Sequence, residues 1–402
     1  MHFPLSFGQP GTWLVAAIWM GLAFVSSLVS IRLKLAGALV EILVGVIAGN
    51  VIALATNTWI DFLAGFGSIM LTFLAGAEID PKVLKAQWKP ALAIGALSFS
   101  APFFAALTFA LFGAHWSVNA AKIAGTAMST TSVAVVYAVM VESGLAETGF
   151  GQLILAACFI TDLGTVVALG LLFANVNSWL ALFVGVSFVV IAFAPRFMPN
   201  FFMRLGDRVS EPGARFLFLL IFLLSGLATL ANSEGVLPAY FLGFSCAGFL
   251  LSHKEFSRGL RRTTMSLLTP FYFIKAGTFV SLTQAAAGVW AIVAFFAVKV
   301  IAKVLAVFPA ARAFRYKAGD AAYLTLMMAT GLTFGTISSL YGLTHGYITQ
   351  AQYTALVTVV ILTAIVPTLI AQRHFPPSQE VIEAESGGLE EIEVRSASNA
   401  SG

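Results

Sequence analysis

Apolar runs of about 20 residues alternate with short polar breaks along most of this chain. A helix that spans a bilayer needs about 20 predominantly apolar residues, so each run predicts one membrane-spanning helix. We expect about thirteen such helices, near residues 12–30, 36–54, 58–77, 90–113, 120–141, 149–173, 178–194, 213–232, 235–251, 266–282, 287–310, 318–342 and 351–371. The pattern predicts an all-α polytopic membrane protein with a transmembrane domain over residues 1–372.

The composition supports this prediction. Hydrophobic residues make up 59% of the chain and charged residues only 10%. Soluble domains carry roughly 25% charged residues, so this composition excludes a soluble fold. The first apolar run lacks a preceding basic segment and a cleavage site, and we interpret it as a retained span and not as a signal peptide. Cys158 and Cys246 both lie within apolar runs, where we expect reduced thiols.

Basic residues gather in alternate loops. Counted from the N-terminus, the odd loops contain Arg32, Lys34, Lys82, Lys85, Lys89, Arg196, Arg204, Arg208, Lys254, Arg258, Arg261, Arg262, Arg312, Arg315 and Lys317. The even loops contain no Lys or Arg, and the nearest exception is Lys122, just inside the fifth span. The positive-inside rule therefore places the odd loops and the C-terminus in the cytoplasm and the N-terminus outside. This distribution explains the net charge of +4 without a nucleic acid or another anionic partner.

The composition changes after Arg373. Residues 373–402 are acidic and rich in Gly and Ser, with too few apolar residues to form a core, so we expect a disordered cytoplasmic tail. The five His residues lie in loops or tails, and the sequence contains neither an HExxH motif nor a Walker A motif. We therefore expect neither an enzyme nor an ATP-driven pump, and no cofactor.

Asp162 is the ionisable residue that lies deepest in an apolar run, near the middle of the run over residues 149–173. A charge at this depth is unfavourable by about 2.5–3.5 kcal/mol on insertion scales, so a packing role explains it poorly. A desolvated carboxylate binds a proton or a cation, and we expect Asp162 to bind each in turn. Thr161 precedes it, and Cys158 lies one turn earlier on the same face. The alternative is a carboxylate held in a structural salt bridge.

Hydroxyl residues interrupt two of the runs. The fifth run contains Ser129, Thr130, Thr131 and Ser132, and the twelfth contains Thr330, Gly331, Thr333, Gly335, Thr336, Ser338 and Ser339. Hydroxyls compete for backbone hydrogen bonds and disfavour a continuous helix, and a break exposes oxygen ligands suited to Na⁺ or K⁺. A run of small residues that only assists helix packing is the alternative.

The positions of these interruptions predict an internal repeat. Each lies in the fifth span of a six-span unit, and one linking span separates the two units. A single linking span gives the units opposite orientations in the membrane. We therefore expect two inverted repeats, a pattern typical of secondary transporters.

Three lysines also lie in apolar runs. Lys299 and Lys303 are four residues apart on one face of the eleventh run, and Lys275 lies in the tenth. We expect Lys299, at mid-depth, to be the charge partner of Asp162, with Lys303 and Lys275 as further candidates. Extension of the Lys303 ammonium toward the cytoplasm, or structural pairing, is the alternative for these lysines.

These motifs resemble the bacterial sodium/proton exchanger family of the monovalent cation/proton antiporter superfamily, which includes potassium/proton exchangers. The resemblance covers roughly residues 12–371 and rests on GALVEILVGVIAGN, LTFLAGAEID, STTSVAVVYAVMVESGLAE, FITDLG and FYFIKAG. It implies a dimerisation bundle and a transport core around residues 90–175 and 287–371. Within that core, two unwound helices would cross beside the aspartate.

By this resemblance, Asp162 and Thr131 would bind the monovalent cation, Ser132 would lie in the first crossover, and Lys299 or Lys303 would face it. The resemblance also implies a homodimer in the bacterial inner membrane. Electrogenic members of the family are similar to one another in having an Asp-Asp pair on this helix, whereas this chain has Thr161 at the first position of the pair. We therefore expect electroneutral exchange.

The sequence thus predicts a secondary antiporter that exchanges Na⁺ or K⁺, with Li⁺ as a third candidate, for H⁺ by alternating access. Two other functions are compatible with the pattern. A sodium-coupled organic anion symporter of similar fold would need a more polar substrate pocket, and a cation channel would conduct without proton counterflow.

Overall fold

The computed structural model describes residues 11–33, 36–52, 54, 56–77, 87–143, 145, 148–173, 178–205, 210–231 and 235–378. All of the regular secondary structure in these ranges is helical. Nine of the described helices, counting those interrupted by a short break as one, are long and apolar enough to cross a membrane. The all-α polytopic fold predicted from the sequence is confirmed.

The described helices lie over each of the predicted ranges. They are α1 (Thr12–Leu33), α2 (Gly37–Val51), α3 (Thr58–Ala77), α5 (Trp88–Thr108), η1 (Phe109–Gly113), α6 (Val118–Ser129), α7 (Val133–Glu142), α8 (Gly149–Leu172), α9 (Ser178–Leu205), α10 (Pro212–Leu230), α11 (Val236–Ser252), α12 (Lys254–Thr263), η2 (Thr264–Leu268), α13 (Thr269–Thr278), α14 (Leu282–Ala287), α15 (Val289–Ala313), α16 (Ala318–Met328), α17 (Thr333–Thr344) and α18 (Gln350–His374). Hydroxyl side chains begin several of them: Ser117, Thr148 and Thr349 accept hydrogen bonds from the first-turn N–H groups of α6, α8 and α18.

Three predicted loops contain helices, one of them the predicted tenth loop, residues 283–286, where α14 lies. Helix α9 continues to Leu205 through the first part of the predicted seventh loop, and α12 occupies the predicted ninth loop. The sequence of α12, KEFSRGLRRT, looks like a loop because it has few apolar residues. It forms a helix because Leu260 is buried while its charged residues remain exposed on the other faces.

The start of the predicted tail is ordered. Helix α18 extends to His374, and the backbone N–H and hydroxyl of Ser378 donate to the buried carboxylate of Asp320, at 2.9 and 3.0 Å. The prediction of disorder from residue 373 is therefore wrong for residues 373–378, because Asp320 offers them acceptors. The rest of the predicted tail, residues 379–402, lies outside the described residues.

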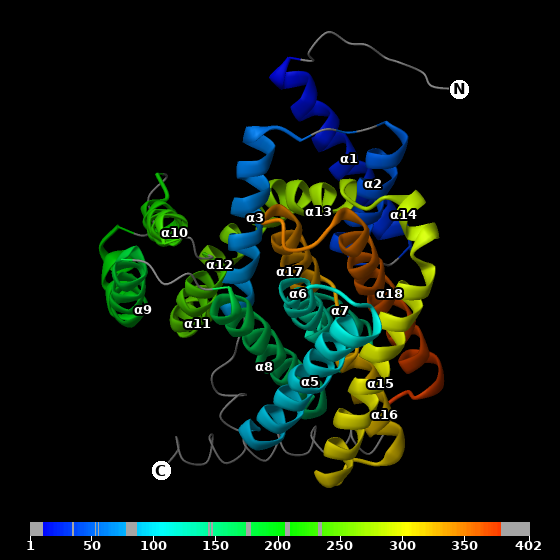
Figure 1. Ribbon diagram of the computed structural model, residues 1–402. Coiled ribbons are helices and arrows are strands. Elements are labelled where there is room, and N and C mark those ends of the chain that lie inside the picture. The colour runs from blue at the N-terminus through cyan, green and yellow to red at the C-terminus, as the bar shows by residue number, and fades with distance from the viewer. Residues whose placement is uncertain are drawn as a thin grey trace, which may run out of the picture.

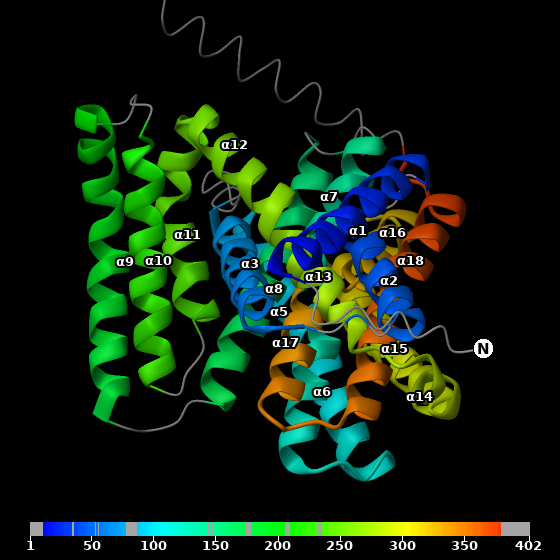
Figure 2. The same cartoon turned by 90° about the horizontal axis from the view of Figure 1, so that it is seen from above.

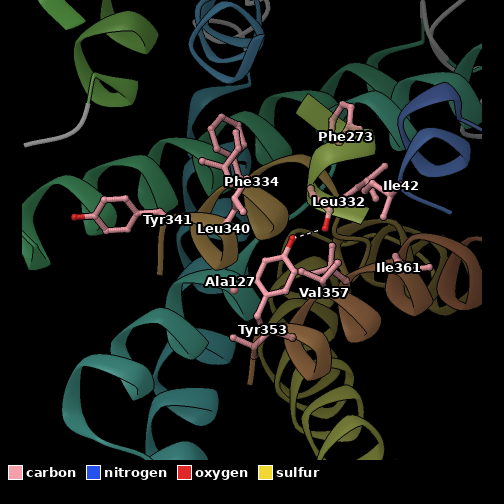
Figure 3. Close-up of a cluster of buried hydrophobic side chains, with 14 of the residues drawn as sticks. Ile42, Ala127, Phe273, Leu332, Phe334, Leu340, Tyr341, Tyr353, Val357 and Ile361 are labelled. Atoms are coloured by element: carbon pink, nitrogen blue, oxygen red, sulfur yellow. Dashed lines mark hydrogen bonds between the residues drawn. The ribbon is translucent and has the colours of Figure 1, made fainter. Parts of the chain in front are cut away.

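The described helices pack into two groups (Figures 1 and 2). In one group, α5 packs on α6, α8 and α15, while α18 packs on α15, α16 and α17. In the other, α3 packs on α11 and α13, α2 packs on α1 and α13, and α9 lies beside α10 and α11. Figure 3 shows a buried apolar cluster where α2, α13 and α18 meet the segment before α17, and there the Tyr353 hydroxyl donates to Ala276 O at 2.7 Å.

Glycine allows the backbones of α2 and α13 to touch. A Cβ atom at Gly45 would overlap the carbonyl oxygen of Ile274, and one at Gly277 would overlap that of Ile42. Small residues permit this close approach in membrane helices, where van der Waals contact replaces the hydrophobic effect as the main attraction between helices.

Replacing Gly45 with alanine should therefore destabilise the protein even though alanine has the higher helix propensity. Overpacking of this kind lowers stability by about 1–3 kcal/mol, which a lower melting temperature in detergent would reveal. Gly21→Ala is the matched control, because no atom lies within 4 Å of the added Cβ. Equal melting temperatures for the two variants would contradict this account of the α2–α13 contact.

Candidate functional site

Asp162 lies in the middle of α8 and is almost completely buried, with 2% of its surface exposed. Its Oδ1 atom has no hydrogen-bond partner among the described residues. A buried carboxylate oxygen without a donor is unfavourable unless a proton or a cation binds to it. Asp162 is therefore not a member of a tight structural ion pair within the described part of the chain, and its free oxygen makes it a candidate binding group.

The two neighbours predicted with Asp162 on α8 have other partners. The Thr161 hydroxyl donates to Ala157 O at 2.9 Å and to Gly95 O of α5 at 3.2 Å. The Cys158 Sγ atom lies 3.7 Å from Met328 Sδ at the end of α16. Thr161 therefore joins α8 to α5, and Cys158 joins it to α16.

Two helix breaks meet beside these residues. Helix α6 ends at Ser129 and α7 begins at Val133, while α16 ends at Met328 and α17 begins at Thr333. The breaks lie at the hydroxyl- and glycine-containing segments singled out in the sequence. The Thr131 hydroxyl donates to Met328 O at 3.0 Å, and the Ser132 N–H donates to Thr330 Oγ1 at 3.3 Å. These contacts bring the carboxyl ends of α6 and α16 together inside the protein.

Lys303 is held at the first break. It is fully buried, and its ammonium donates to Ser98 Oγ at 2.7 Å, to Ser129 O at 3.1 Å and to Thr131 Oγ1 at 3.1 Å. Lys303 therefore does not extend toward the cytoplasm. Its ammonium binds a free carbonyl at the end of α6, where the helix dipole favours a cation.

Lys299 lies one turn earlier on α15 and faces the second break. It is fully buried, and its Nζ atom has no hydrogen-bond partner among the described residues. The ammonium lies against Gly331, so closely that a Cβ atom there would overlap Nζ. Among the described residues neither Lys299 nor Lys303 forms an ion pair with Asp162, and Lys303 is the lysine that binds the first break.

The remaining predicted residues are more distant or internally satisfied. Lys275 pairs with Asp61 across α13 and α3 at 2.8 Å, within the other helix group. Thr333 is the first residue of α17, and the Thr336 hydroxyl donates to Leu332 O at 2.8 Å within that helix. Ser98 on α5 was not predicted, since a single serine in an apolar run resembles an ordinary packing residue.

The arrangement is suited to a monovalent cation and a proton. It offers one carboxylate with a free oxygen, hydroxyl groups from Thr130 to Ser132, and carbonyl oxygens at two interrupted helices. Unwound carbonyls and helix carboxyl ends coordinate Na⁺ or H⁺ in transporters with broken helices. The same carboxylate can hold only one of the two positive species at a time.

Known proteins share this fold and sequence pattern. Residues 20–373 match the family described as "Sodium/hydrogen exchanger, transmembrane". The chain is 27% identical over 280 residues to Bacillus subtilis (strain 168) YjbQ, covering 63% of this chain and 45% of that relative. It is 22% identical over 365 residues to the Na(+)/H(+)-K(+) antiporter GerN of Bacillus cereus, covering 88% and 94%. The chain thus spans less than half of the first relative and most of the second.

A solved structure is similar over most of both chains. The sodium proton antiporter MjNhaP1 from Methanocaldococcus jannaschii, at pH 8, matches with a TM-score of 0.67 and 14% sequence identity. The match covers 91% of this chain and 99% of that one. At this identity, the likeness shows that the two chains share a fold.

Asp162 on α8 and Lys303 on α15 belong to helices that both pack on α5, so their opposite charges should be measurable as an energetic coupling. Both side chains are buried, so Lys303→Met removes a nearby positive charge from Asp162 and Asp162→Asn removes a nearby negative charge from Lys303, and each variant should have a lower melting temperature in detergent. The double variant should lose less stability than the two single variants lose together, which corresponds to a coupling free energy of about 0.5–3 kcal/mol. Asp162→Asn combined with Lys275→Met is the control and should be additive. Additive losses of stability in both pairs of substitutions would contradict the predicted interaction between Asp162 and Lys303.

Proposed function

The chain belongs to the sodium/hydrogen exchanger family, and we propose that it exchanges a monovalent cation for H⁺ across the bacterial inner membrane, with Asp162 as the shared binding group. The observation that supports this most directly is the free Oδ1 atom of Asp162 beside two helix breaks that contact each other. The candidate cations are Na⁺ and K⁺, the ions in the name of the relative GerN, and Li⁺ is a third to be tested.

Competition for one carboxylate couples the two fluxes. When H⁺ binds, Asp162 is neutral, and when the cation binds, its charge is balanced. Either loaded form passes through the low-dielectric interior more readily than the bare carboxylate. The cation would be bound by the Asp162 carboxylate together with oxygens of the first break, among them the Thr131 hydroxyl. Return of the empty, charged site is disfavoured, so uncoupled leakage is small.

Alternating access would come from movement of one helix group against the other. Asp162, both breaks and both α15 lysines belong to the group that contains α5–α8 and α15–α18. The second group includes α2, α3, α11 and α13, where Gly45 and Gly277 allow direct backbone contact. We propose that the first group is the transport core, built from two inverted repeats, and that the second provides the stationary dimerisation bundle of a homodimer.

The exchange is proposed to be electroneutral. Thr161 stands where a second carboxylate would be needed, and its hydroxyl is occupied by Ala157 O and Gly95 O. A single carboxylate exchanges one proton for one cation. The basic residues in the last turns of α1, α15 and α18, namely Arg32, Arg312 and Arg373, agree with a cytoplasmic C-terminus and an external N-terminus.

Asp162→Asn should abolish exchange while the protein remains folded, since the amide neither releases a proton nor balances a cation. The measurement is the rate of dissipation of a pH gradient in proteoliposomes after addition of Na⁺, K⁺ or Li⁺. Asp61→Asn is the matched control, because this carboxylate belongs to the other helix group and is 48% exposed. We expect at least a hundredfold loss for Asp162→Asn, equivalent to about 2.7 kcal/mol, and near-normal exchange for Asp61→Asn.

Retained exchange in Asp162→Asn, with a normal elution profile, would contradict the assignment of this residue. Wild-type cation flux without proton movement would favour a channel. Flux that requires an added organic anion would favour a symporter.

A further inference from the structure

Lys299 is a buried positive group that the proposed exchange does not use. Lys303 already provides the ammonium that binds the first break. Lys299 makes no hydrogen bond in the described part of the chain, although its side chain is completely buried. A charged group in this position is unfavourable unless the surrounding dipoles stabilise it. The atoms around Lys299 Nζ therefore indicate the role of this ammonium.

Two threonine hydroxyls lie close to the position of the Lys299 ammonium. A Cβ atom placed on Gly331 would overlap Lys299 Nζ and would lie 3.1 Å from Thr130 Oγ1 and 3.3 Å from Thr363 Oγ1. Thr130 Oγ1 donates to Ala127 O at 3.0 Å, and Thr363 Oγ1 donates to Val360 O at 3.0 Å. Because both protons are used, these oxygens present lone pairs to the space beside Gly331.

The same space lies just beyond the carboxyl end of α16. Helix α16 ends at Met328, and Gly331 belongs to the break that follows it. The carboxyl end of a helix carries a partial negative charge and favours a cation. Lys303 occupies the equivalent place at the carboxyl end of α6 through Ser129 O. One α15 lysine therefore lies at each of the two interrupted helices, but of the two only Lys303 is hydrogen-bonded within the described residues.

We propose that the Lys299 ammonium is a covalently attached substitute for a second monovalent cation, in a cation position formed by Thr130, Gly331 and Thr363. An ammonium has the charge of K⁺ and a similar size, and it prefers the same oxygen ligands. The missing Cβ of Gly331 leaves room for it, and the helix end attracts it. This proposal rests on the proposed function and extends it, since a permanently filled second position leaves one free cation to be exchanged in each cycle.

Removal of the lysine side chain should convert this position into a site for a free ion. The test uses the full-length protein with Asp162→Asn in the background, so that binding at the main site does not contribute. Melting temperatures are measured in detergent with KCl, NaCl or choline chloride at constant ionic strength. The melting temperature of Asp162→Asn/Lys299→Ala should rise with K⁺ or Na⁺ concentration until it saturates. At saturation it should exceed the value in choline chloride by on the order of 2 °C or more. Asp162→Asn alone should show no such dependence.

Two controls separate this site from nonspecific effects. Asp162→Asn/Lys303→Ala removes the neighbouring lysine and should gain no saturable cation dependence. Adding Thr363→Val to the Lys299→Ala protein removes one proposed oxygen ligand and should reduce the apparent cation affinity at least tenfold. Equal responses in the Lys299→Ala and Lys303→Ala proteins, or no response in either, would overturn the proposal.

A folding defect would also be informative. A Lys299→Ala protein that is monodisperse only when purified in K⁺ or Na⁺ would support the proposal. A Lys299→Ala protein that is not monodisperse in any of the salts would contradict it. The assay reads cation binding without requiring transport. Absence of exchange by the wild-type protein in proteoliposomes would therefore contradict the proposed function without deciding the role of Lys299. Absence of a cation-dependent rise in the melting temperature of the Lys299→Ala protein would contradict only the proposed role of Lys299.

Discussion

Interrupting a helix inside a membrane leaves backbone carbonyls and N–H groups without partners, and each of them must be satisfied by the protein because lipid offers none. The structure meets this requirement by placing two interruptions in contact. Thr131 donates to the last carbonyl of α16, Thr330 accepts from the N–H of Ser132, and Lys303 binds the last carbonyl of α6. The hydroxyl side chains that disfavour the helix thus also supply the partners that the broken backbone needs.

The same requirement explains why the proposed ion site lies at this place. Groups that satisfy a broken backbone are oxygens and ammonium groups, and they gather where two helices lose their regular hydrogen bonds. Asp162 lies in the uninterrupted helix α8 beside this place and keeps one oxygen free. In the proposed exchange, the energetic difference between a bare and a neutralised carboxylate makes movement of the core depend on what is bound. Under this proposal, stabilisation of the fold and coupling of the fluxes depend on the same residues.

Much of this arrangement could be predicted from the sequence, because its signals are local. The run from Ser129 to Ser132 competes with its own helix, and the polar position of Asp162 is conspicuous in an apolar segment. Which lysine binds the first break could not be predicted. Lys299 and Lys303 share one face of α15, and only the tertiary position of the α6 end shows that Lys303 reaches it. The partner of Lys275 was hidden for a similar reason, since Asp61 lies on a helix far away in the sequence.

The most direct test of the central claim, that one carboxylate exchanges one cation for one proton, is proton flux through the wild-type protein in proteoliposomes with a clamped membrane voltage. A cation gradient of Na⁺ or K⁺ provides the driving force, and an internal pH indicator provides the reading. The account predicts a pH change that requires the cation and has the same initial rate at positive, zero and negative voltage. A rate that changes systematically with voltage, or a pH change that does not need the cation, would contradict it.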